Sequence, residues 1–476
     1  MNHWELTVGL EVHIQLSTKT KMFCHCLKKY GEEPNSLTCP ICLAMPGALP
    51  VINQEAINMA LKLSHALHFN VNHHTSFSRK NYFYPDLPKG YQISQFNDPI
   101  CYGGFLDIED DKKKYKIGIT RAHLEEDSGK LIHHSDNYSF IDLNRAGSPL
   151  IEIVSEPDIH SSEHAKLYLE KLKQIIKYLD ISDCDMEKGN LRVDINVSVK
   201  KKDEINLGTR REVKNLNSFK SVQKAIEYEF NEQIRILESG DKVLQTTLTW
   251  DEKNNKTKIL RKKEDAHDYR YFPEPDLPIL EITDSQIKKI STQIPELPDD
   301  KKKRFKSTYN LKDQDLKVLI SDLDWANYFE SLVKLTNLPQ DTSNWVLGEI
   351  LGYSNKNNID INEMPIDQTR LSDLIILFNK GKLTNINAKK IFHIMLTDNR
   401  SASEIMEQEK MMVIEDGSFL DAIVERVIQD NSSEFERLKN GESKLVGFFM
   451  GQIMKESKGK ADPQTIKEAI HKIISE

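Results

Sequence analysis

Glu11 and His13 stand two positions apart in a segment, residues 5–16, in which apolar and polar residues alternate. The apolar residues take every second position: Leu6, Val8, Leu10, Val12, Ile14 and Leu16. A period of two is typical of a β-strand with one buried face, so Glu11, His13 and Gln15 share the other face. Neighbouring side chains on one face of a strand are about 6–7 Å apart. A carboxylate and an imidazole at that spacing can bind a metal ion or a phosphate group; an ordinary solvated strand face is the alternative.

The cysteines offer a second kind of chemistry. Four of the six form two close pairs: Cys24, Cys26, Cys39 and Cys42. Thiols stay reduced in the cytosol, and four thiolates supply the closed tetrahedral ligand set of a structural Zn²⁺. Because the first pair is tighter than the usual Cys-x-x-Cys, unmetallated thiols and a redox pair are alternatives, and His25 is a candidate substitute ligand. Cys101 and Cys184 have no partner in the sequence and are expected to be free and partly buried.

Further carboxylates lie in or beside apolar strand patterns. Glu125, Glu126 and Asp127 form an acidic triplet, and Glu152 is the one charged residue of the apolar segment 150–154. A lone carboxylate in such a segment is costly to bury unless it is paired or binds a cation. Each carboxylate taken singly is better explained as a surface group, but together, on strands of one domain, they favour a site.

A second alternating strand, residues 192–199, places Arg192, Asp194 and Asn196 on its polar face. Oxygen ligands from several strands, together with one histidine, suit Mg²⁺ that bridges nucleotide phosphates. The chain has no Gly-x-x-x-x-Gly-Lys-Ser/Thr loop, no Gly-x-Gly-x-x-Gly and no Gly-x-Ser-x-Gly. A nucleotide-dependent enzyme with this sequence therefore needs another architecture.

Basic and aromatic residues gather in two segments, 79–86 and 267–276. Both combine cations that can hold phosphate with rings that can stack on a base. Loops whose rings fill the core are the alternative. His160 and His164 lie four residues apart without an acidic companion, and we expect them to bind no metal.

The composition is that of a soluble globular protein. The chain has 476 residues, 29% of them charged, and a net charge of −8. No apolar segment approaches the roughly 18 residues of a membrane span, and no secretory signal is visible, so a cytoplasmic location is expected. A tight nonspecific nucleic-acid binder is usually basic, so any RNA contact must use a local patch.

The elements that must position these residues change in kind along the chain. Residues 1–290 are rich in short alternating strands interrupted by helices, which favours an α+β domain with an antiparallel sheet. The composition changes near residue 295, and the pattern beyond it is typical of helices. We expect three domains: 1–293 with a zinc-binding insertion around 24–42, a helical domain 294–400, and a helical tail domain 401–476.

Several motifs together resemble one family, the B subunits of aspartyl/glutamyl-tRNA amidotransferases (GatB/GatE). The resemblance covers essentially the whole chain. It rests on Val-Gly-Leu-Glu-Val-His (8–13), Arg-Lys-Asn-Tyr-Phe-Tyr-Pro-Asp (79–86), Tyr-Gln-Ile-Ser-Gln-Phe (91–96), Leu-Glu-Glu-Asp-Ser-Gly-Lys (124–130), Asp-Leu-Asn-Arg-Ala-Gly-Ser-Pro-Leu-Ile-Glu-Ile-Val (142–154), Asp-Tyr-Arg-Tyr-Phe-Pro-Glu-Pro-Asp (268–276) and Leu-Val-Gly-Phe-Phe-Met-Gly-Gln-Ile-Met-Lys (445–455).

The resemblance implies a cradle domain similar to the glutamine synthetase catalytic domain, followed by a tail shared with YqeY-like proteins. It implies phosphorylation of the side-chain carboxylate of Glu-tRNA(Gln) or Asp-tRNA(Asn) with ATP and Mg²⁺. Ammonia from the amidase partner GatA then displaces phosphate, in a heterotrimer with GatC. Whether one charged tRNA or both are substrates is left open.

The family's functional positions fall on residues of this sequence. The metal-binding and catalytic positions implied by the resemblance are Glu11, His13, Glu125 and Glu152. Weaker matches, for contacts to ATP or the acyl end, are Lys80, Tyr82, Arg192 and Asp194. The zinc-bearing branch of the family matches Cys24, Cys26, Cys39 and Cys42. Strand alternation places Glu125 with Arg121 and His123 and so favours Glu125 over Glu126 as the metal ligand.

The tail is expected to bind the tRNA body through a locally positive stretch, residues 443–460. Its lysines are Lys444, Lys455, Lys458 and Lys460. Backbone contacts to RNA need only such a local patch, although a solvated helix end is the alternative. Gly447 and Gly459 fit either close approach to RNA or helix packing.

Two other function classes compete with the amidotransferase subunit. A non-catalytic, zinc-stabilised RNA-binding subunit explains the cysteines and the tail but leaves Glu11, His13 and Glu152 without a role. A stand-alone ATP-dependent ligase or kinase for a small acid does not explain about 75 residues of appended helices.

Overall fold

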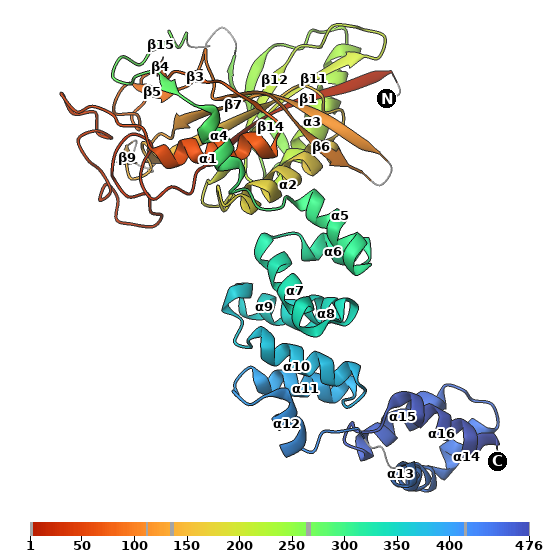
Figure 1. Cartoon of the computed structure of the whole chain (residues 1–476). Coiled ribbons are helices and arrows are strands. Elements are labelled where there is room, and N and C mark those ends of the chain that lie inside the picture. The colour runs from red at the N-terminus through yellow and green to blue at the C-terminus, as the bar shows by residue number, and fades with distance from the viewer. Residues whose placement is uncertain (1–2, 111–112, 134–137, 263–267, 414–416, 476) are drawn as a thin grey trace. The chain divides into compact units, whose positions relative to one another are not determined.

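The computed structural model of the chain describes residues 3–110, 113–133, 138–262, 268–413 and 417–475 (Figure 1). The backbone divides into two compact units, Met1–Pro298 and Asp299–Glu476. The strands of the described residues lie in unit 1, and unit 2 is helical. The expected α+β class is therefore confirmed.

Unit 1 is built from sixteen strands and four α-helices within the described ranges. The strands are β1 (Trp4–Gln15), β2 (Asn70–Val71), β3 (His74–Thr75), β4 (Ser78–Asn81), β5 (Tyr91–Ser94), β6 (Cys101–Glu109), β7 (Lys114–Glu126), β8 (Lys130–His133), β9 (Ser139–Asp142), β10 (Pro149–Ser155), β11 (Leu191–Lys201), β12 (Arg211–Leu216), β13 (Thr246–Asp251), β14 (Lys256–Lys262), β15 (Phe272–Pro273) and β16 (Leu280–Glu281). The helices are α1 (Gln54–Ala66), α2 (Ser162–Tyr178), α3 (Phe219–Glu238) and α4 (Asp284–Ser291).

One large sheet organises unit 1, in the order β14-β13-β12-β11-β1-β10-β7-β5-β4-β15, with β6 also paired to β7 and β2 to β6. Its strand pairs are antiparallel, as expected, except that β12 and β13 run parallel. The strand expected over residues 5–16 is β1, which lies in the middle of the sheet between β10 and β11. The two alternating strands of the sequence thus become neighbours, because β11 pairs with β1 over almost its full length.

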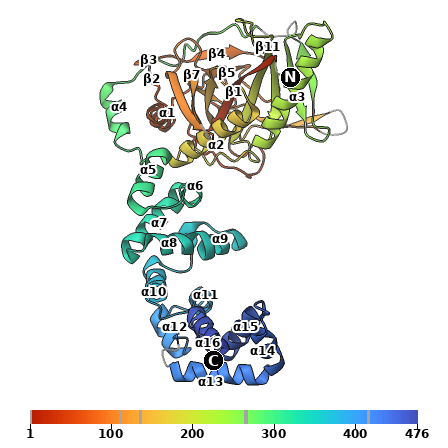
Figure 2. The ribbon, with the colours of Figure 1, turned by 90° about the vertical axis from the view of Figure 1, so that its right-hand side faces the viewer.

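The apolar face of the sheet forms the core of unit 1. The six apolar residues of β1 and its continuation, from Leu6 to Leu16, are all buried in one cluster with the apolar faces of α1, α2 and α3. Figure 2 shows α2 and α3 lying along that face. Each helix begins at a residue suited to a cap: Asn53, Ser161 and Ser218 accept backbone N–H hydrogen bonds of the first turns of α1, α2 and α3. With helices on one face, the opposite, polar face is the one that can hold a site.

Unit 2 consists of helices in the described residues: α5 (Pro298–Tyr309), α6 (Asp313–Leu319), α7 (Leu323–Thr336), α8 (Pro339–Trp345), a π-helical turn (Val346–Ile350), α9 (Leu351–Asn357), a 3₁₀ turn (Ile361–Glu363), α10 (Gln368–Asn379), α11 (Asn385–Met395), α12 (Ala402–Gln408), α13 (Gly417–Asp430), α14 (Ser432–Lys439), α15 (Leu445–Glu456) and α16 (Pro463–Ser475). It has two apolar clusters, one between Phe305 and Met406 and one between Leu420 and Ile470. In the described residues we find no helix long and apolar enough to cross a bilayer.

Candidate active site

The polar face of the central strands carries one row of titratable side chains. His13 on β1 is directly opposite Glu152 on β10, and Glu152 is directly opposite His123 on β7. On the other side of β1, His13 is opposite Arg192 of β11. Directly opposed residues of antiparallel strands point to the same face, so one row crosses four strands. The register therefore brings together residues from positions 13, 123, 152 and 192.

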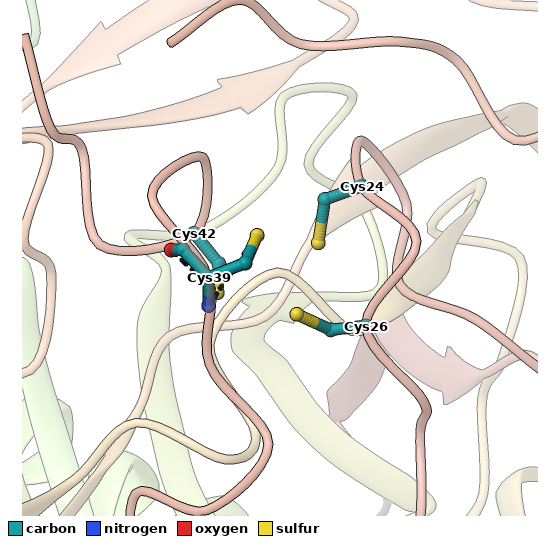
Figure 3. Close-up of side chains that lie close together, drawn as sticks. All are labelled: Cys24, Cys26, Cys39 and Cys42. Carbon is teal, nitrogen blue, oxygen red and sulfur yellow. Dashed lines mark hydrogen bonds between the residues drawn. The ribbon is translucent and has the colours of Figure 1, made fainter.

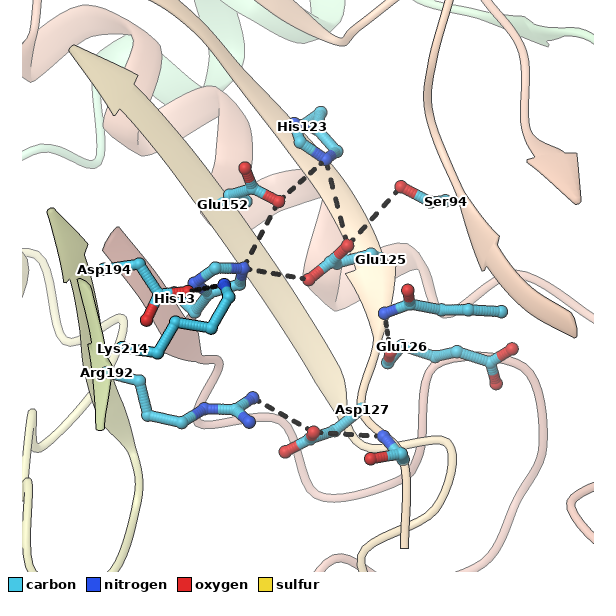
Figure 4. Close-up of polar contacts among 12 residues, drawn as sticks. His13, Ser94, His123, Glu125, Glu126, Asp127, Glu152, Arg192, Asp194 and Lys214 are labelled. Carbon is cyan, nitrogen blue, oxygen red and sulfur yellow. Dashed lines mark hydrogen bonds and ion pairs between the residues drawn. The ribbon is translucent and has the colours of Figure 1, made fainter. Parts of the chain in front are cut away.

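Glu152 and Glu125 lie between two histidine rings (Figure 4). His13 Nε2 is 3.3 Å from Glu152 Oε2 and 3.7 Å from Glu125 Oε1. His123 Nε2 is 3.4 Å from Glu152 Oε2 and 3.9 Å from Glu125 Oε2. Ser94 of β5 adds a long hydrogen bond, 3.5 Å from Oγ to Glu125 Oε2. Three of these residues, His13, Glu125 and Glu152, offer ligand atoms that all lie within 4.8 Å of one another, which is a spacing suited to one cation.

The four groups have strongly shifted pKa values. Burial opposes a charge on His13, but Glu152 and then Glu125 overcome it and raise the His13 pKa to about 9. Burial and the neighbouring Glu152 raise the pKa of Glu125 to about 7. Glu152 is held ionised despite its burial, since the hydrogen bond and the positive charge of His13 keep its pKa below the usual range. Burial lowers the pKa of His123 to about 4, so this ring is neutral near pH 7.

A second carboxylate group lies beside the first and contains Glu11. Glu11 of β1 is directly opposite Asp194 of β11, and its ligand oxygen lies within 4.8 Å of those of Asp194 and Glu212. Burial first, and Glu152 next, raise the pKa of Glu11. The set of four expected metal ligands is thus divided: the structure places His13, Glu125 and Glu152 in one group and Glu11 in another.

Lys214 of β12 balances this second group. Its Nζ is 2.5 Å from Asp194 Oδ2 and 2.6 Å from Glu212 Oε1. Asn196 donates a 2.8 Å hydrogen bond to Glu11 Oε1. A hollow of ≈ 220 Å³ adjoins Glu11 and Asn196 and is lined in addition by Arg210 and by the buried Thr7.

Glu125 and Glu126 point in different directions, as strand alternation requires. Glu126 accepts a 2.9 Å hydrogen bond from the Ile93 backbone N–H and pairs with Lys89. The contacts of Glu126 are therefore to β5 and the loop before it. Only Glu125 of the two is part of the group with His13 and Glu152.

Three of the residues expected to contact ATP or the acyl end lie around the carboxylates: Lys80, Tyr82 and Arg192. Lys80 Nζ lies 4.9 Å from the centre of the Tyr269 ring, and, although burial opposes it, Glu125 and nearby tyrosines raise the Lys80 pKa. Tyr82 lines a hollow of ≈ 440 Å³ together with Tyr269 and neighbouring residues. The Arg192 guanidinium donates a 3.0 Å hydrogen bond to Asp127 Oδ1 and so closes one end of the row.

The two basic and aromatic segments meet, since β4 pairs with β15. Arg79 does not face an open phosphate site there: it donates hydrogen bonds of 2.8 and 2.7 Å to the two oxygens of buried Glu274. The start of the second segment, His267, lies outside the described residues. In this region the rings of Phe96 and Tyr271 stack with centroids 3.9 Å apart, but Phe96 is exposed, as are Phe83, Tyr84 and Phe272 of the two segments, so these rings do not fill the core.

The four cysteines of the zinc prediction all lie in the segment of the chain that connects β1 to α1. Figure 3 shows that their side chains converge. The four sulfurs are those of Cys24, Cys26, Cys39 and Cys42, and all lie within 4.8 Å of one another. A tetrahedral Zn²⁺ with bonds of about 2.3 Å needs sulfurs roughly 3.8 Å apart, and Cys39 Sγ and Cys42 Sγ are 3.9 Å apart. The donor set fits zinc. His25 is exposed and does not belong to the group. Cys101 and Cys184 are free, as expected, and they are completely buried, whereas partial burial was expected.

Family models match both units. The model described as "GatB/GatE catalytic domain" matches residues 6–288, and the one described as "GatB domain" matches residues 327–474. The chain belongs to the GatB/GatE family. Proteins named as the B subunit of aspartyl/glutamyl-tRNA(Asn/Gln) amidotransferase are similar throughout: that of Persephonella marina is 46% identical over 99% of both chains, and that of Thermodesulfovibrio yellowstonii is 46% identical over 99% of this chain and 100% of its own. That of Chlorobium chlorochromatii is 45% identical over 98% and 99%.

The tail of this GatB/GatE-family chain presents most of the expected lysines to solvent. Lys444, Lys455 and Lys458 are exposed and Lys460 is half-buried. Gly459, by contrast, is enclosed: its carbonyl accepts a 2.6 Å hydrogen bond from Thr384 Oγ1. Helix packing therefore accounts for Gly459, while Gly447 has no atom of the described chain within 4 Å of where a Cβ would lie.

Three members of the site were not singled out from the sequence: His123, Glu212 and Lys214. The alternation of β7 did place His123 on the face of Glu125, which was a usable signal. Glu212 and Lys214 lie on β12, a six-residue strand whose register with β11 shifts between Val193 and Ile195. A short, irregular strand gives little periodicity, and only the pairing brings its side chains to Asp194.

Proposed function

We propose that the chain is the B subunit of a tRNA-dependent amidotransferase and that unit 1 performs its ATP-dependent step. In that step the side-chain carboxylate of Glu-tRNA(Gln), Asp-tRNA(Asn) or both is phosphorylated, and the acyl phosphate is then amidated. The observation that carries the proposal is the convergence of His13, Glu125 and Glu152 on one polar sheet face beside a second carboxylate group. Family membership and the names of the relatives agree with it.

The chemistry explains why such a face is needed. Ammonia cannot readily expel an oxide from a carboxylate. A carboxylate oxygen of the charged tRNA instead attacks the γ-phosphorus of ATP, and ADP leaves. Ammonia then adds to the acyl carbon, inorganic phosphate leaves, and a proton is lost to give the amide. Phosphoryl transfer of this kind depends on positioning and on neutralising the charges of the phosphates.

Two groups of residues would hold Mg²⁺. The first is His13, Glu125 and Glu152; the second is Glu11, Asp194 and Glu212. When bound, Mg²⁺ would neutralise phosphate charge and orient the γ-phosphate. Carboxylate oxygens from different strands are suitable ligands for a hard cation, and rigid neighbouring strands keep the two groups in a fixed relation.

The cations around the carboxylates have complementary roles in this proposal. Lys80 approaches the group from β4 and would contact the phosphates or the acyl end of the tRNA, with Tyr82 beside it. Lys214 would exchange part of its pairing with Asp194 and Glu212 for phosphate oxygens. Arg192, held by Asp127, would close the site at its other end.

The remaining functional assignments are proposed from the tail, the cysteines and the family. The exposed lysines of residues 443–460 would contact the tRNA backbone. The cysteine group would hold a structural Zn²⁺. Ammonia would come from an amidase partner, GatA, in a complex that also contains GatC.

The experiment is release of labelled γ-phosphate from ATP by the chain co-purified with its partners, with ammonium chloride in place of glutamine. Release that requires Glu-tRNA(Gln) or Asp-tRNA(Asn), and that falls at least a hundredfold on Glu11→Ala, supports the proposal. Release that is indifferent to charged tRNA, with tRNA binding intact, would instead indicate the non-catalytic RNA-binding subunit.

A further inference from the structure

Lys21 is a buried cation beside the cysteine group. Its side chain has 0% exposure, and its Nζ lies 3.6 Å from Cys42 Sγ and 3.2 Å from the Leu143 carbonyl oxygen. Among the described residues, no carboxylate forms an ion pair with it. An ammonium group taken out of water costs several kcal/mol unless nearby anions and acceptors offset that cost. The sulfur group is the anion within its reach.

With zinc bound, the cysteine group carries the negative charge that can pair with the Lys21 ammonium. Four thiolates and one Zn²⁺ sum to a charge of −2. A neighbouring ammonium therefore offsets part of a buried negative charge and is itself offset by it. The backbone of Lys21 contacts the cysteine group as well: its N–H donates a 3.0 Å hydrogen bond to the Cys26 carbonyl.

The other contact of Lys21 is to the turn between β9 and β10, residues 143–148. The next residue, Met22, donates a 2.7 Å hydrogen bond from its N–H to the Gly147 carbonyl. Gly147 has a φ of +84°, and a Cβ there would lie 3.5 Å from Lys21 Cδ and 3.8 Å from Cys42 Cβ. The turn, the lysine and the cysteine group thus pack against one another directly.

The segment between the two cysteine pairs, residues 27–38, is hydrogen-bonded to the start of the same turn. Asn35 Oδ1 accepts a 2.8 Å hydrogen bond from the Leu143 N–H, and Asn144 Oδ1 accepts one of 2.8 Å from the Leu37 N–H. Asn144 Nδ2 donates in return to the Glu33 carbonyl at 2.7 Å. Cysteines of the group stand at both ends of this segment. Without the metal, the segment would no longer be held in place and would no longer fix the turn.

On its far side the turn is bonded to the end of β7. Gly147 N–H donates to the Asp127 carbonyl at 2.9 Å, and Asp127 N–H donates to the Ser148 carbonyl at 2.8 Å. Asp127 is the partner of Arg192, and it follows Glu125 by two residues. Strand β10, which carries Glu152, begins directly after the turn at Pro149.

We propose that Lys21 is a positioning residue that couples metal occupancy of the cysteine group to the turn 143–148, and thereby to the placement of Asp127 and Glu152. Zinc loading then sets the geometry of the polar face as well as the stability of the insertion. The catalytic consequence rests on the function proposed above; the coupling between metal and turn does not.

The test uses Lys21→Met, which keeps the apolar stem of the side chain and removes the charged terminal ammonium, in the full chain co-purified with its partners. We expect zinc transfer to a chromogenic chelator to become roughly 10- to 100-fold faster, as for other residues that support metal ligands. We expect faster amide hydrogen exchange in residues 143–150. Lys21→Arg, which restores the charge, should recover most of the zinc retention.

Lys28→Met is the matched control, because Lys28 lies in the same segment but contacts Gln15 Oε1 at 3.4 Å and not a sulfur. It should leave both readouts at the wild-type level. Wild-type zinc retention in Lys21→Met, or rapid zinc loss with unchanged exchange in 143–150, would overturn the coupling. These readouts do not depend on phosphoryl transfer. A failed phosphate-release assay in the wild type would therefore contradict the proposed function and leave the coupling between metal and turn unaffected.

Should Lys21→Met fail to fold, two measurements still decide the question. Stripping zinc from the wild-type complex should speed hydrogen exchange in 143–150 before it does so in α2 or α3. Gly147→Ala perturbs the turn itself, because alanine is strained in the left-handed backbone at φ +84°, and should therefore weaken zinc retention. Unchanged exchange after stripping would show that metal and turn are independent.

Discussion

His13 and Glu152 face each other across the pair β1 and β10, with 3.3 Å between His13 Nε2 and Glu152 Oε2. The carboxylate interrupts an otherwise apolar stretch of β10, where an unpaired charge would cost several kcal/mol. The imidazolium of His13 on one side and the neutral ring of His123 on the other offset that cost. Holding a carboxylate ionised in a buried position prepares it to receive a cation without reorganisation.

The first prediction concerns that charge. Glu152→Gln keeps the size and hydrogen-bonding capacity of the side chain but removes the negative charge, so we expect the fold to be retained. Phosphate release dependent on charged tRNA should fall at least a hundredfold, roughly the loss of 3 kcal/mol of transition-state stabilisation. The measurement is γ-phosphate release at saturating ATP and Mg²⁺.

Glu156→Gln is the matched control for this variant. It makes the same chemical change just beyond the end of β10, where Glu156 accepts a hydrogen bond from Thr120 and lies outside the carboxylate groups. It should keep the wild-type rate. A Glu152→Gln protein that retained more than half of that rate would remove Glu152 from the reaction.

The second prediction treats His123 as a residue that acts through Glu125 and Glu152. Its Nδ1 is buried and without a partner among the described residues, while its Nε2 is the ring nitrogen that faces the two carboxylates, at 3.4 Å from Glu152 and 3.9 Å from Glu125. His123→Ala should therefore weaken Mn²⁺ binding, used as a stand-in for Mg²⁺, by about 10- to 100-fold. Titration followed by electron paramagnetic resonance measures this directly.

His123→Gln supplies a donor near the position of Nε2 and should recover much of the affinity lost in His123→Ala. A purely packing role for the ring would leave both variants equally weak, and this result would contradict the prediction. The KM for ATP with Mg²⁺ should rise in parallel with the loss of Mn²⁺ affinity, while tRNA binding stays unchanged.

The face of a strand to which each side chain points could be predicted from this sequence, but the residues that it meets on the adjacent strands could not. Alternation in residues 5–16 separated the buried residues of β1 from Glu11 and His13, and it placed Glu125 apart from Glu126. Which residues meet depends on register, and a shift of one residue would reverse every side chain of a strand. The sequence pattern alone therefore could not divide Glu11 from His13 or bring Asp194 to Glu11.

The cysteine group illustrates the opposite case. Its ligands are close in sequence, so the spacing of Cys24, Cys26, Cys39 and Cys42 carries most of the information about their convergence. Lys21 could not be found in this way, because a lysine before a cysteine segment is normally exposed. Its importance follows only from its complete burial and from the distant turn that it contacts.

The third prediction concerns the tail. Lys455 and Lys458 are exposed at the end of α15, and we expect both to contact phosphates of the tRNA body. The double variant Lys455→Ala, Lys458→Ala should weaken tRNA binding roughly tenfold near 0.1 M salt and reduce the slope of log K against log salt by about 2. Filter binding over a range of salt concentrations measures both quantities.

Lys356→Ala is the control for charge alone, since Lys356 is an exposed lysine of α9 outside the positive stretch. It should change neither affinity nor slope appreciably. An unchanged slope in the double variant would show that these two lysines belong to a solvated helix end and that tRNA is bound elsewhere.

The fourth prediction separates the two glycines of the tail. Gly459 has a φ of +76°, and a Cβ there would lie 3.1 Å from Asn387 Oδ1. Gly459→Ala adds the cost of a left-handed alanine, about 1–2 kcal/mol, to the strain of that contact. Unit 2 should therefore unfold at a lower temperature, as measured by calorimetry on the full chain.

Gly447→Ala provides the internal comparison, because Gly447 is exposed in α15 and its Cβ would meet no atom within 4 Å. Alanine is a better helix former by about 1 kcal/mol, so this variant should be neutral or slightly stabilising. Opposite effects of the same chemical change would assign Gly459 to the packing of the tail against Thr384 and Asn387. Equal tolerance of both changes, with tRNA binding lost only in Gly459→Ala, would instead assign Gly459 to RNA contact.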